Sequence, residues 1–286
     1  MREDSLVSII IPAYNSAAYI REAIGSARTQ TYQNIEIIVV DDGSTDNLKK
    51  ILTPYITKGL IRYFYEGNKG LAAARNFGMR NAKGNYIAFL DADDIFLSGK
   101  IETQVKYLET HPECDVSYCD IWHFYEDSGA QNVSLRYNYY SGDEVFPNLL
   151  KKNFINPLTV VMRSSLVGRF GFFNEQFRRS EDWEYWVRLS WRGARFCFLP
   201  EKLARYRIRR TSMSYDWRSE VERKRKELEI FRWLRSEMSP QELRRFHIRK
   251  VLLIHWLKLL YAQGGDKVKM LRAIHLWLQR KRLASA

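Results

Sequence analysis

The chain has 286 residues, of which 45% are hydrophobic and 28% are charged. This length and composition predict a folded protein with a sizeable core and exclude a disordered chain. No run of 18 or more apolar residues occurs, and the first 15 residues carry acids where a signal peptide needs basic residues, so we expect a cytoplasmic protein without a membrane-spanning helix.

The cysteines and the charge give two further expectations. Cys114, Cys119 and Cys197 are odd in number and fit no zinc module, which predicts a reducing compartment and no structural disulfide.

Residues 1–200 hold 23 basic and 24 acidic residues, whereas residues 201–286 hold 23 basic and 9 acidic residues. The net charge of +13 therefore belongs to the C-terminal third, which predicts an anionic partner for that segment.

The first 95 residues alternate between two hydrophobic periods. Buried-strand patterns cover residues 6–15, 35–47, 61–67 and 86–94, and helical patterns cover residues 17–30, 48–56 and 71–82. This alternation predicts βαβ units and a mostly parallel sheet. Because ligands bind beyond the carboxyl ends of such strands, the polar clusters that end three of the strands should share one edge.

The remaining chain is less regular. Residues 100–112 predict a helix, residues 115–124 a strand, residues 171–177 a turn, residues 180–194 an aromatic helix, and the region near 196 to 207 a pair of strands. Beyond about residue 216 the pattern is helical and basic. We therefore expect an α/β catalytic domain over residues 1–215, divided at residues 95 and 96, and a helical C-terminal region over residues 216–286.

Two acidic clusters follow buried strands. Asp41 and Asp42 end one strand, and Asp91, Asp93 and Asp94 end another. Taken alone, the second cluster is equally typical of a turn with a helix N-cap. Two such clusters at one edge instead favour a divalent cation, because Mg²⁺ and Mn²⁺ take one or two carboxylates and complete their shell with substrate phosphates.

Six segments together resemble the family 2 glycosyltransferases with the GT-A fold. They read "VSIIIPAYN", "IIVVDDGSTDN", "GLAAARNFG", "YIAFLDADD", "SEDWEYWVRL" and "YRIRRTSMS", and the resemblance covers roughly residues 5–215. It implies an α/β, Rossmann-like catalytic domain that binds a nucleotide-sugar donor with Mn²⁺ or Mg²⁺. The implied metal ligands are Asp93 and Asp91, and the implied donor-binding residues are Pro12, Ala13, Tyr14, Asn15, Asp41, Asp42, Arg75, Asp91, Ala92, Asp93 and Arg209.

The resemblance also implies the catalytic base. A base must take the proton of the acceptor hydroxyl, and the family supplies it from the position of Glu181-Asp182, which makes Asp182 the candidate. Glu181, Trp183 and Trp186 are the implied acceptor-binding residues. The alternatives are that the acids only complement the helix macrodipole and that Trp186 belongs to the core.

One position departs from the family pattern. Where members often carry a histidine that helps the metal or the diphosphate, this chain has Arg209. Arginine cannot bind a metal but can clamp phosphate through two hydrogen bonds. The Gln-x-x-Arg-Trp motif of processive synthases is absent, so we expect one sugar to be added per encounter.

The basic C-terminal region predicts amphipathic helices. Leu243, Phe246, Val251, Ile254, Leu257 and Leu260 are expected to form one apolar stripe, with Trp256 and Trp277 beside it. Interfacial helices on an anionic membrane have this composition, which would place the protein peripherally on the inner face of the cell membrane. The alternatives are packing on the catalytic domain and a homodimer.

The sequence therefore predicts an inverting, metal-dependent glycosyltransferase. It would move a sugar from a nucleotide diphosphate, UDP in the first instance, to a hydroxyl of a lipid-linked or glycan acceptor. A sugar-phosphate nucleotidyltransferase is the rival enzyme, but its glycine-rich signature is missing near the N-terminus. The rival without activity is a basic protein that binds anionic lipid or nucleic acid through a degenerate domain; no compact nucleic-acid motif occurs.

Overall fold

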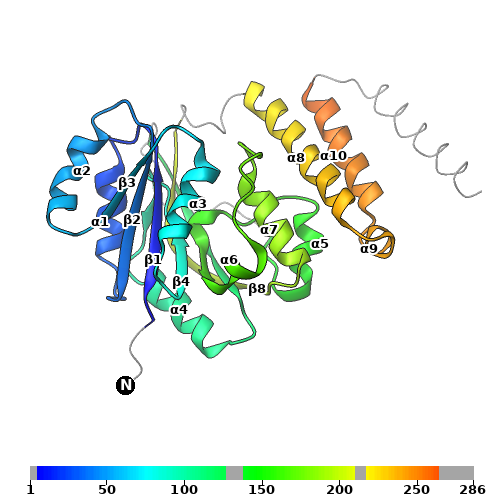
Figure 1. The fold of residues 1–286 in the computed structure, drawn as a ribbon. Helices are drawn as coiled ribbons and strands as arrows, with labels where there is room; N and C mark the ends of the chain where they lie inside the picture. The colour runs from blue at the N-terminus through cyan, green and yellow to red at the C-terminus, as the bar shows by residue number, and fades with distance from the viewer. Residues whose placement is uncertain (1–4, 127–137, 210–216, 264–286) are drawn as a thin grey trace, which may run out of the picture. The chain divides into compact units, whose positions relative to one another are not determined.

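The computed structural model describes residues 5–126, 138–209 and 217–263 (Figure 1). The chain forms two compact units, residues 1–209 and 210–286. The first unit is built on an eight-stranded sheet whose strand order is β3-β2-β1-β4-β7-β6-β8-β5. Its first half consists of the parallel strands β1 (Val7–Ala13), β2 (Ile35–Asp42), β3 (Arg62–Glu66) and β4 (Tyr86–Phe89). The four strands and the parallel pairing predicted from the sequence are confirmed.

Helices cover both faces of this parallel half (Figure 1). The helices of this half are α1 (Ile20–Arg28), α2 (Leu48–Thr57) and α3 (Leu71–Asn81), whereas α4 (Lys100–Thr110) packs against strands of the second half. Apolar side chains of α1, α2 and α4 form one core with Val7, Ile9 and Ile11 of β1. On the other face, α3 packs so closely that a Cβ on Gly78 would lie 2.4 Å from Ile10 Cγ2, so only glycine fits there.

The second half of the sheet is mixed. Strand β7 (Val160–Arg163) runs antiparallel to both β4 and β6 (Val116–Tyr125), and the short β5 (Ile95–Phe96) pairs with β8 (Phe196–Ile208) at the edge. Helices α5 (Val145–Leu149), α6 (Ser165–Phe170) and α7 (Glu181–Trp191) and the 3-10 turns η1 (Gly142–Glu144) and η2 (Pro157–Thr159) connect these strands.

The expected pair of strands near residues 196 to 207 is wrong, because β8 is a single strand parallel to β6. Its register against β6 moves from Cys119↔Leu199 to Asp120↔Lys202, so Pro200 and Glu201 lie outside the pairing. Proline lacks the N–H that a ladder needs, so it is found at strand edges and bulges and not within a regular ladder. The strand accommodates it by a bulge.

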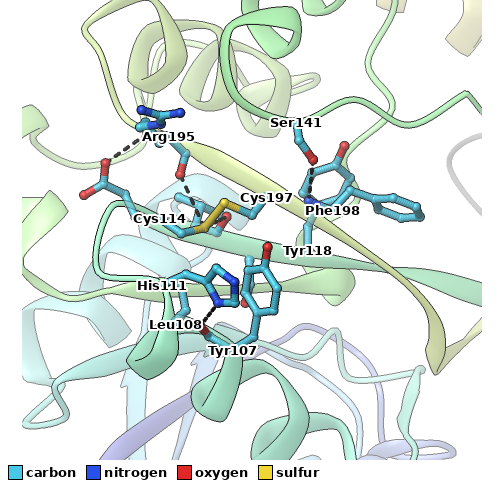
Figure 2. Close-up of a disulfide and its surroundings, with 12 residues drawn as sticks. Tyr107, Leu108, His111, Cys114, Tyr118, Ser141, Arg195, Cys197 and Phe198 are labelled. Atoms are coloured by element: carbon cyan, nitrogen blue, oxygen red, sulfur yellow. Dashed lines mark hydrogen bonds between the residues drawn. A yellow bond between two sulfur atoms is a disulfide. The ribbon is translucent and has the colours of Figure 1, made fainter.

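The expectation of no structural disulfide is also wrong. Cys114, just before β6, is bonded to Cys197 of β8, and their Cα atoms lie 6.2 Å apart (Figure 2). The 83 residues between them conceal this proximity, which arises because Ser117 of β6 lies opposite Cys197. Cys119, buried in β6, is the cysteine left unpaired.

The second unit is helical in its described part. It comprises α8 (Trp217–Glu237), α9 (Pro240–Arg245) and α10 (Ile248–Ala262). Phe231 of α8 stacks on His255 of α10 with ring centroids 4.3 Å apart. The predicted single stripe is interrupted, because His247 adopts a left-handed conformation (φ 50°) between α9 and α10. Leu243 and Phe246 therefore precede the break, and Ile248 and His255 are the buried residues of α10; Trp277 lies outside the described residues.

Candidate active site

The carboxyl ends of β1, β2 and β4 meet at one edge of the sheet. Ala13, the last residue of β1, lies opposite Asp41, and Ile10 lies opposite Phe89 of β4. The Leu90 N–H also donates to the Ile10 carbonyl at 3.0 Å, which carries the β4 chain along β1 to Asp91. The structure thus brings the two acidic clusters to the same edge, as the strand pattern predicts.

Asp41 and Asp42 are buried and organise the loops of this edge. Asp42 accepts hydrogen bonds from the backbone N–H groups of Lys69 and Gly70, at 2.7 and 2.8 Å, at the start of α3. Asp41 accepts from Tyr63 Oη and from the Ser44 N–H, each at 2.8 Å. Both carboxylates therefore fix the loops that follow β2 and β3 at this edge.

The end of β1 forms the other wall of this region. Pro12 and Ala13 are buried, whereas Tyr14 is 49% exposed. Asn15 is left-handed (φ 47°), accepts a hydrogen bond from the Thr45 N–H at 2.8 Å, and donates its own N–H to Ser44 Oγ. Tyr14 is thus the residue of this group that presents a large open surface.

The segment Asp91 to Asp94 is held by the end of β8. Arg207 donates its N–H to Asp94 Oδ1 and its Nε to the Asp93 carbonyl, both at 2.8 Å. Arg209 donates to the Asp93 carboxylate and lies over the ring of Tyr19. Burial, followed by the charges of Asp93 and Asp91, raises the pKa of Asp94 well above its ordinary value. Asp94 therefore anchors the end of β8, and the next helix, α4, has Gly99 at its N-cap, so Asp94 is not the helix N-cap that the acidic cluster taken alone would suggest.

Asp91 and Asp93 remain partly open. Their side chains are 26% and 27% exposed, and each contacts an arginine: Arg75 for Asp91 and Arg209 for Asp93. Burial and the neighbouring Asp91 raise the pKa of Asp93. Arg209 lies at the site as predicted, although its contact is with an acid. Ala92, between the two acids, is buried.

Arg75 of α3 lies beneath this cluster and not in an open cleft. Its side chain is 2% exposed, and it donates from Nη2 to Asp91 Oδ1 at 2.9 Å and from Nη1 to Glu181 Oε1 at 2.7 Å. The guanidinium also lies 5.6 Å from the ring centroid of Phe173. One side chain thus joins the end of β4 to the start of α7.

The acid pair at the start of α7 has two distinct environments. Glu181 is 5% exposed, and burial raises its pKa to about 7 although Arg75 opposes the shift. Asp182 is less buried and accepts hydrogen bonds from Asn153 Nδ2 at 2.9 Å and from the Trp183 N–H at 2.8 Å. Burial also raises the pKa of Asp182, against the charge of Arg75. Asp182 is the more accessible carboxylate of the two.

The acceptor-binding prediction for Trp183 and Trp186 is wrong. They are 4% and 0% exposed, so neither indole face is open to a sugar ring. Trp183 Nε1 donates to the Leu149 carbonyl at 2.7 Å, and Trp186 Nε1 donates to the Ile155 carbonyl at 3.1 Å. Both residues belong to the core that holds α7, and the buried Glu181 lies against Arg75 on the inner side of the site.

Sequence reasoning missed several residues of this site. Asn153, which holds Asp182, belongs to no recognisable motif and lies 29 residues away in the sequence. Asn76 follows Arg75 and binds the loop before α7 through the Phe173 N–H and carbonyl, each at 2.9 Å. Asn76 is one of four polar residues on α3, so the sequence carried no signal that distinguished it.

The family model described as Glycosyl transferase family 2 matches residues 8–176. The chain belongs to this family. The match includes both acidic clusters of the sheet edge, and the α7 acids follow directly after it.

Relatives in this family include proteins named as glycosyltransferases. An uncharacterized glycosyltransferase of Rickettsia typhi is 40% identical over 190 residues, which are 64% of this chain and 58% of the relative. The glycosyltransferase GlyG of Streptococcus pneumoniae is 30% identical over 237 residues, which are 76% of this chain and 77% of the relative. The chain spans only 30% to 58% of the length of its matches in Rickettsia felis, Rickettsia typhi and Rickettsia conorii.

Solved structures with the GT-A fold are similar in their backbone. TarS 1-349 of S. aureus in complex with UDP-GlcNAc has a TM-score of 0.67 at 20% identity, over 89% of this chain and 72% of that chain. The mannosyltransferase PcManGT of Pyrobaculum calidifontis, in complex with GDP-Man and Mn²⁺, has a TM-score of 0.64 at 18% identity, over 100% and 82%. These similarities show that the fold of this chain is GT-A.

Two carboxylates, Asp91 and Asp93, are suited to a hard cation. Within the described residues no group of three or more His, Cys, Asp or Glu side chains is placed to hold a metal. A pair of partly exposed carboxylates nevertheless fits a Mg²⁺ or Mn²⁺ ion that takes the rest of its shell from substrate phosphates.

None of the helices in the described part of the chain is long and apolar enough to span a membrane.

Proposed function

We propose that this glycosyltransferase is an inverting, metal-dependent enzyme. It takes a sugar from a nucleotide diphosphate, UDP in the first instance, and transfers it to a hydroxyl of a lipid-linked or glycan acceptor. The observation that supports this best is the bridge from Asp91 through Arg75 to Glu181, with bonds of 2.9 and 2.7 Å. It brings the acids expected at the donor next to the acids expected at the acceptor.

The donor residues follow from their positions around the sheet edge. Tyr14 offers the open ring for the nucleotide, and the Asp41 and Asp42 loops form the pocket for the base. Asp91 would meet the ribose and share the cation with Asp93. When bound, that cation would neutralise the diphosphate that leaves. Arg209, now on Asp93, adds a guanidinium that can hydrogen-bond phosphate oxygens.

Asp182 has the properties of the base. The acceptor oxygen forms a bond to the anomeric carbon as the bond from that carbon to the diphosphate oxygen breaks, and the hydroxyl proton passes to the Asp182 carboxylate. A single displacement of this kind inverts the anomeric configuration. Asn153 and the Trp183 N–H fix the carboxylate in place, and its raised pKa makes it a better proton acceptor than an ordinary aspartate.

Calorimetry with UDP, GDP and dTDP, and then with their sugars, would test the donor assignment. We expect one nucleotide to bind only with Mn²⁺ or Mg²⁺, and Asp93→Ala to abolish that dependence while the exposed Asp46→Ala does not. Release of the nucleoside diphosphate with an acceptor present would show transfer. Nucleotide binding that EDTA leaves unaffected would refute the metal assignment.

We further propose that the C-terminal unit binds an anionic membrane. The basic residues Arg244, Arg245, Arg249 and Lys250 are exposed on α9 and α10. On α10, Ile254 is 39% and Tyr261 is 72% exposed, so apolar surface accompanies the charge. Such a combination suits a lipid headgroup region better than water. The division into a donor half (1–95), an acceptor half (96–215) and this region (216–286) is part of the same proposal.

A further inference from the structure

Arg75 differs from the other arginines of the site in its burial. It is 2% exposed, whereas Arg209 is 24% exposed. A buried guanidinium is costly to desolvate unless carboxylates and hydrogen bonds compensate it. Here two carboxylates from distant parts of the chain do so, Asp91 at 16 residues and Glu181 at 106 residues along the sequence.

The shape of the side chain explains why one residue can serve both acids. A guanidinium is planar and presents donors at fixed angles, so its two terminal nitrogens define two fixed directions. Nη1 meets Glu181 and Nη2 meets Asp91. A lysine ammonium at this place would carry the same charge but would lack the planar fork that fixes both directions.

The surroundings of Arg75 hold it still. The Phe173 ring lies against the guanidinium, with its centroid 5.6 Å away. Asn76 donates from Nδ2 to the Phe173 carbonyl and accepts from the Phe173 N–H through Oδ1. The Phe173 ring in turn packs on Tyr185 of α7, with centroids 4.2 Å apart. Helix α3, the loop before α7 and α7 itself are therefore joined into one support.

We propose that Arg75 is a positioning residue that fixes the donor-side carboxylate Asp91 and the acid pair at the start of α7 in one geometry. This inference rests on the proposed transfer reaction and deepens it. Arg75 acts through Asp91 and Glu181, and it sets the distance between the sugar carbon that is attacked and the base that takes the proton.

A direct contact with the donor is the competing role. Arg75 Nε has no hydrogen-bond partner within the described residues, but the atom is buried, so a donor could reach it only if the neighbouring side chains moved. The two roles differ in what a substitution changes. Loss of a donor contact weakens nucleotide binding, whereas loss of positioning lowers the rate with the nucleotide still bound.

The test compares Arg75→Lys and Arg75→Ala with Arg80→Ala in the full-length protein. Arg80 is the matched control, because it lies on the same helix and also pairs with an acid, Glu175 at 3.4 Å, but is 50% exposed. We expect Arg75→Lys to lower kcat about 100-fold, since a misplacement near 1 Å costs about that much. The Kd for UDP with Mn²⁺, measured by calorimetry, should rise by much less than kcat falls, because Asp91 loses its fixed orientation while Asp41, Asp42 and Asp93 stay in place. Arg80→Ala should change neither quantity.

Guanidinium chloride below denaturing concentrations provides a second readout. Arg75→Ala leaves a buried space beside two carboxylates, so added guanidinium should restore part of kcat, whereas equal sodium chloride should not. Hydrogen exchange gives a third readout that needs no substrate. The amides of residues 91–94 and 181–184 should both exchange faster in the Arg75 variants, and neither should do so in Arg80→Ala.

Each outcome separates the two roles. A Kd for UDP that rises as far as kcat falls would show a direct donor contact and overturn the positioning role. Exchange that increases in one segment alone, or in neither, would show that no bridge exists. If the wild-type protein releases no nucleoside diphosphate with any donor and acceptor, the proposed function fails, while the exchange experiment still decides whether Arg75 joins the two segments.

Discussion

At the scale of single residues, the neighbouring acids of α7 have separate tasks. Glu181 faces inward to Arg75, and Asp182 lies toward the open side with Asn153. Desolvation raises the pKa of both, but the more exposed acid is the one that can meet an acceptor hydroxyl. Adjacent positions on a helix point in different directions, so one acid of the pair is buried and the other is accessible to an acceptor in the proposed reaction.

We predict that Asp182→Asn removes transfer and leaves nucleotide binding intact. Loss of a general base typically lowers a rate by about 10² to 10⁴. The measurements are nucleoside diphosphate release and the Kd for UDP with Mn²⁺. Asp143→Asn, on an exposed acid of η1, serves as the control. Turnover close to that of the wild-type protein would exclude Asp182 as the base.

The raised pKa of Asp182 predicts a shifted pH profile. The base works only when deprotonated, so kcat/KM should fall as pH decreases through a pKa above the ordinary value of about 3.9. Asn153→Ala removes a hydrogen bond that lowers this pKa, so the acidic limb should move to higher pH. A profile recorded between pH 4 and 8 would show the shift. An unmoved limb would separate Asn153 from the titrating base.

Trp186→Phe should reduce stability without affecting the acceptor. The substitution leaves the buried Ile155 carbonyl without its indole donor, which costs about 1–3 kcal/mol. Urea unfolding should show a lower midpoint with the KM for the acceptor unchanged. The opposite pattern, a wild-type midpoint with a higher KM, would return Trp186 to the acceptor site.

At the scale of elements, the disulfide joins β6 to β8 at the ends where both strands begin. Arg207 and Arg209 come from the other end of β8. The bond closes a long stretch of chain, and bonds of this kind typically stabilise a protein by about 2–4 kcal/mol. Its direct effect is on the second half of the sheet, far along the strand from the residues that hold Asp93.

We predict that the unreduced protein, once denatured, titrates as one free thiol, that of Cys119, and as three after reduction. Cys114→Ser should lower the unfolding temperature, and Cys119→Ala should leave the bond intact. Both variants should keep the wild-type Kd for UDP. Three thiols before reduction would contradict the Cys114–Cys197 pairing.

Local patterns were sufficient for the first half of the sheet. Strands that are buried on both faces and end in acids, with helices between them, determine a parallel order and one carboxyl edge, so Asp41, Asp42 and Asp91 could be placed without a structure. The GT-A fold was not predicted from these patterns but was implied by the resemblance of six segments to the family 2 glycosyltransferases. Inference from local patterns succeeds where neighbours in the sequence are also neighbours in the fold.

Long-range pairing accounts for what the sequence did not disclose. The Cys114–Cys197 bond, the bulge of β8 at Pro200 and the contact between Asn153 and Asp182 all depend on registers between segments far apart in the chain. The acceptor-binding prediction for Trp186 failed for another reason. An aromatic residue beside the candidate base has the same local sequence pattern whether it faces a sugar or the core. Burial alone distinguishes the two cases.

At the scale of the whole molecule, the excess of basic over acidic residues lies in the C-terminal third of the chain, residues 201–286. Each basic residue close to an anionic leaflet contributes about 1 kcal/mol, so a few exposed arginines and lysines suffice to hold the protein there. We predict that Arg249→Glu/Lys250→Glu weakens flotation with phosphatidylglycerol vesicles at low salt. Both side chains are exposed on α10.

Lys49→Glu/Lys50→Glu is the matched control for that experiment. It changes the total charge by the same amount, but on α2 of the catalytic unit, where both lysines are also exposed. The control should float like the wild-type protein, and raising the salt should weaken flotation because screening shortens the Debye length to about 3 Å at 1 M. If both double variants lose flotation equally, the net charge of the chain and not a specific surface determines binding. If the wild-type protein does not float at low salt but forms a dimer, the C-terminal unit binds a second copy of the chain and not a membrane.

The Asp91–Arg75–Glu181 bridge has a consequence for how such enzymes diverge. Removing Arg75 alone leaves two partly or fully buried carboxylates without their positive partner. Removing one of the acids alone leaves the buried guanidinium with a single carboxylate partner. Neither single change is expected to be neutral, so we expect the three positions to vary together among related chains. Residues that bind the sugar and the acceptor but do not contact this bridge are not bound by that constraint. Their substitution can therefore change substrate specificity while Asp91, Arg75 and Glu181 stay the same.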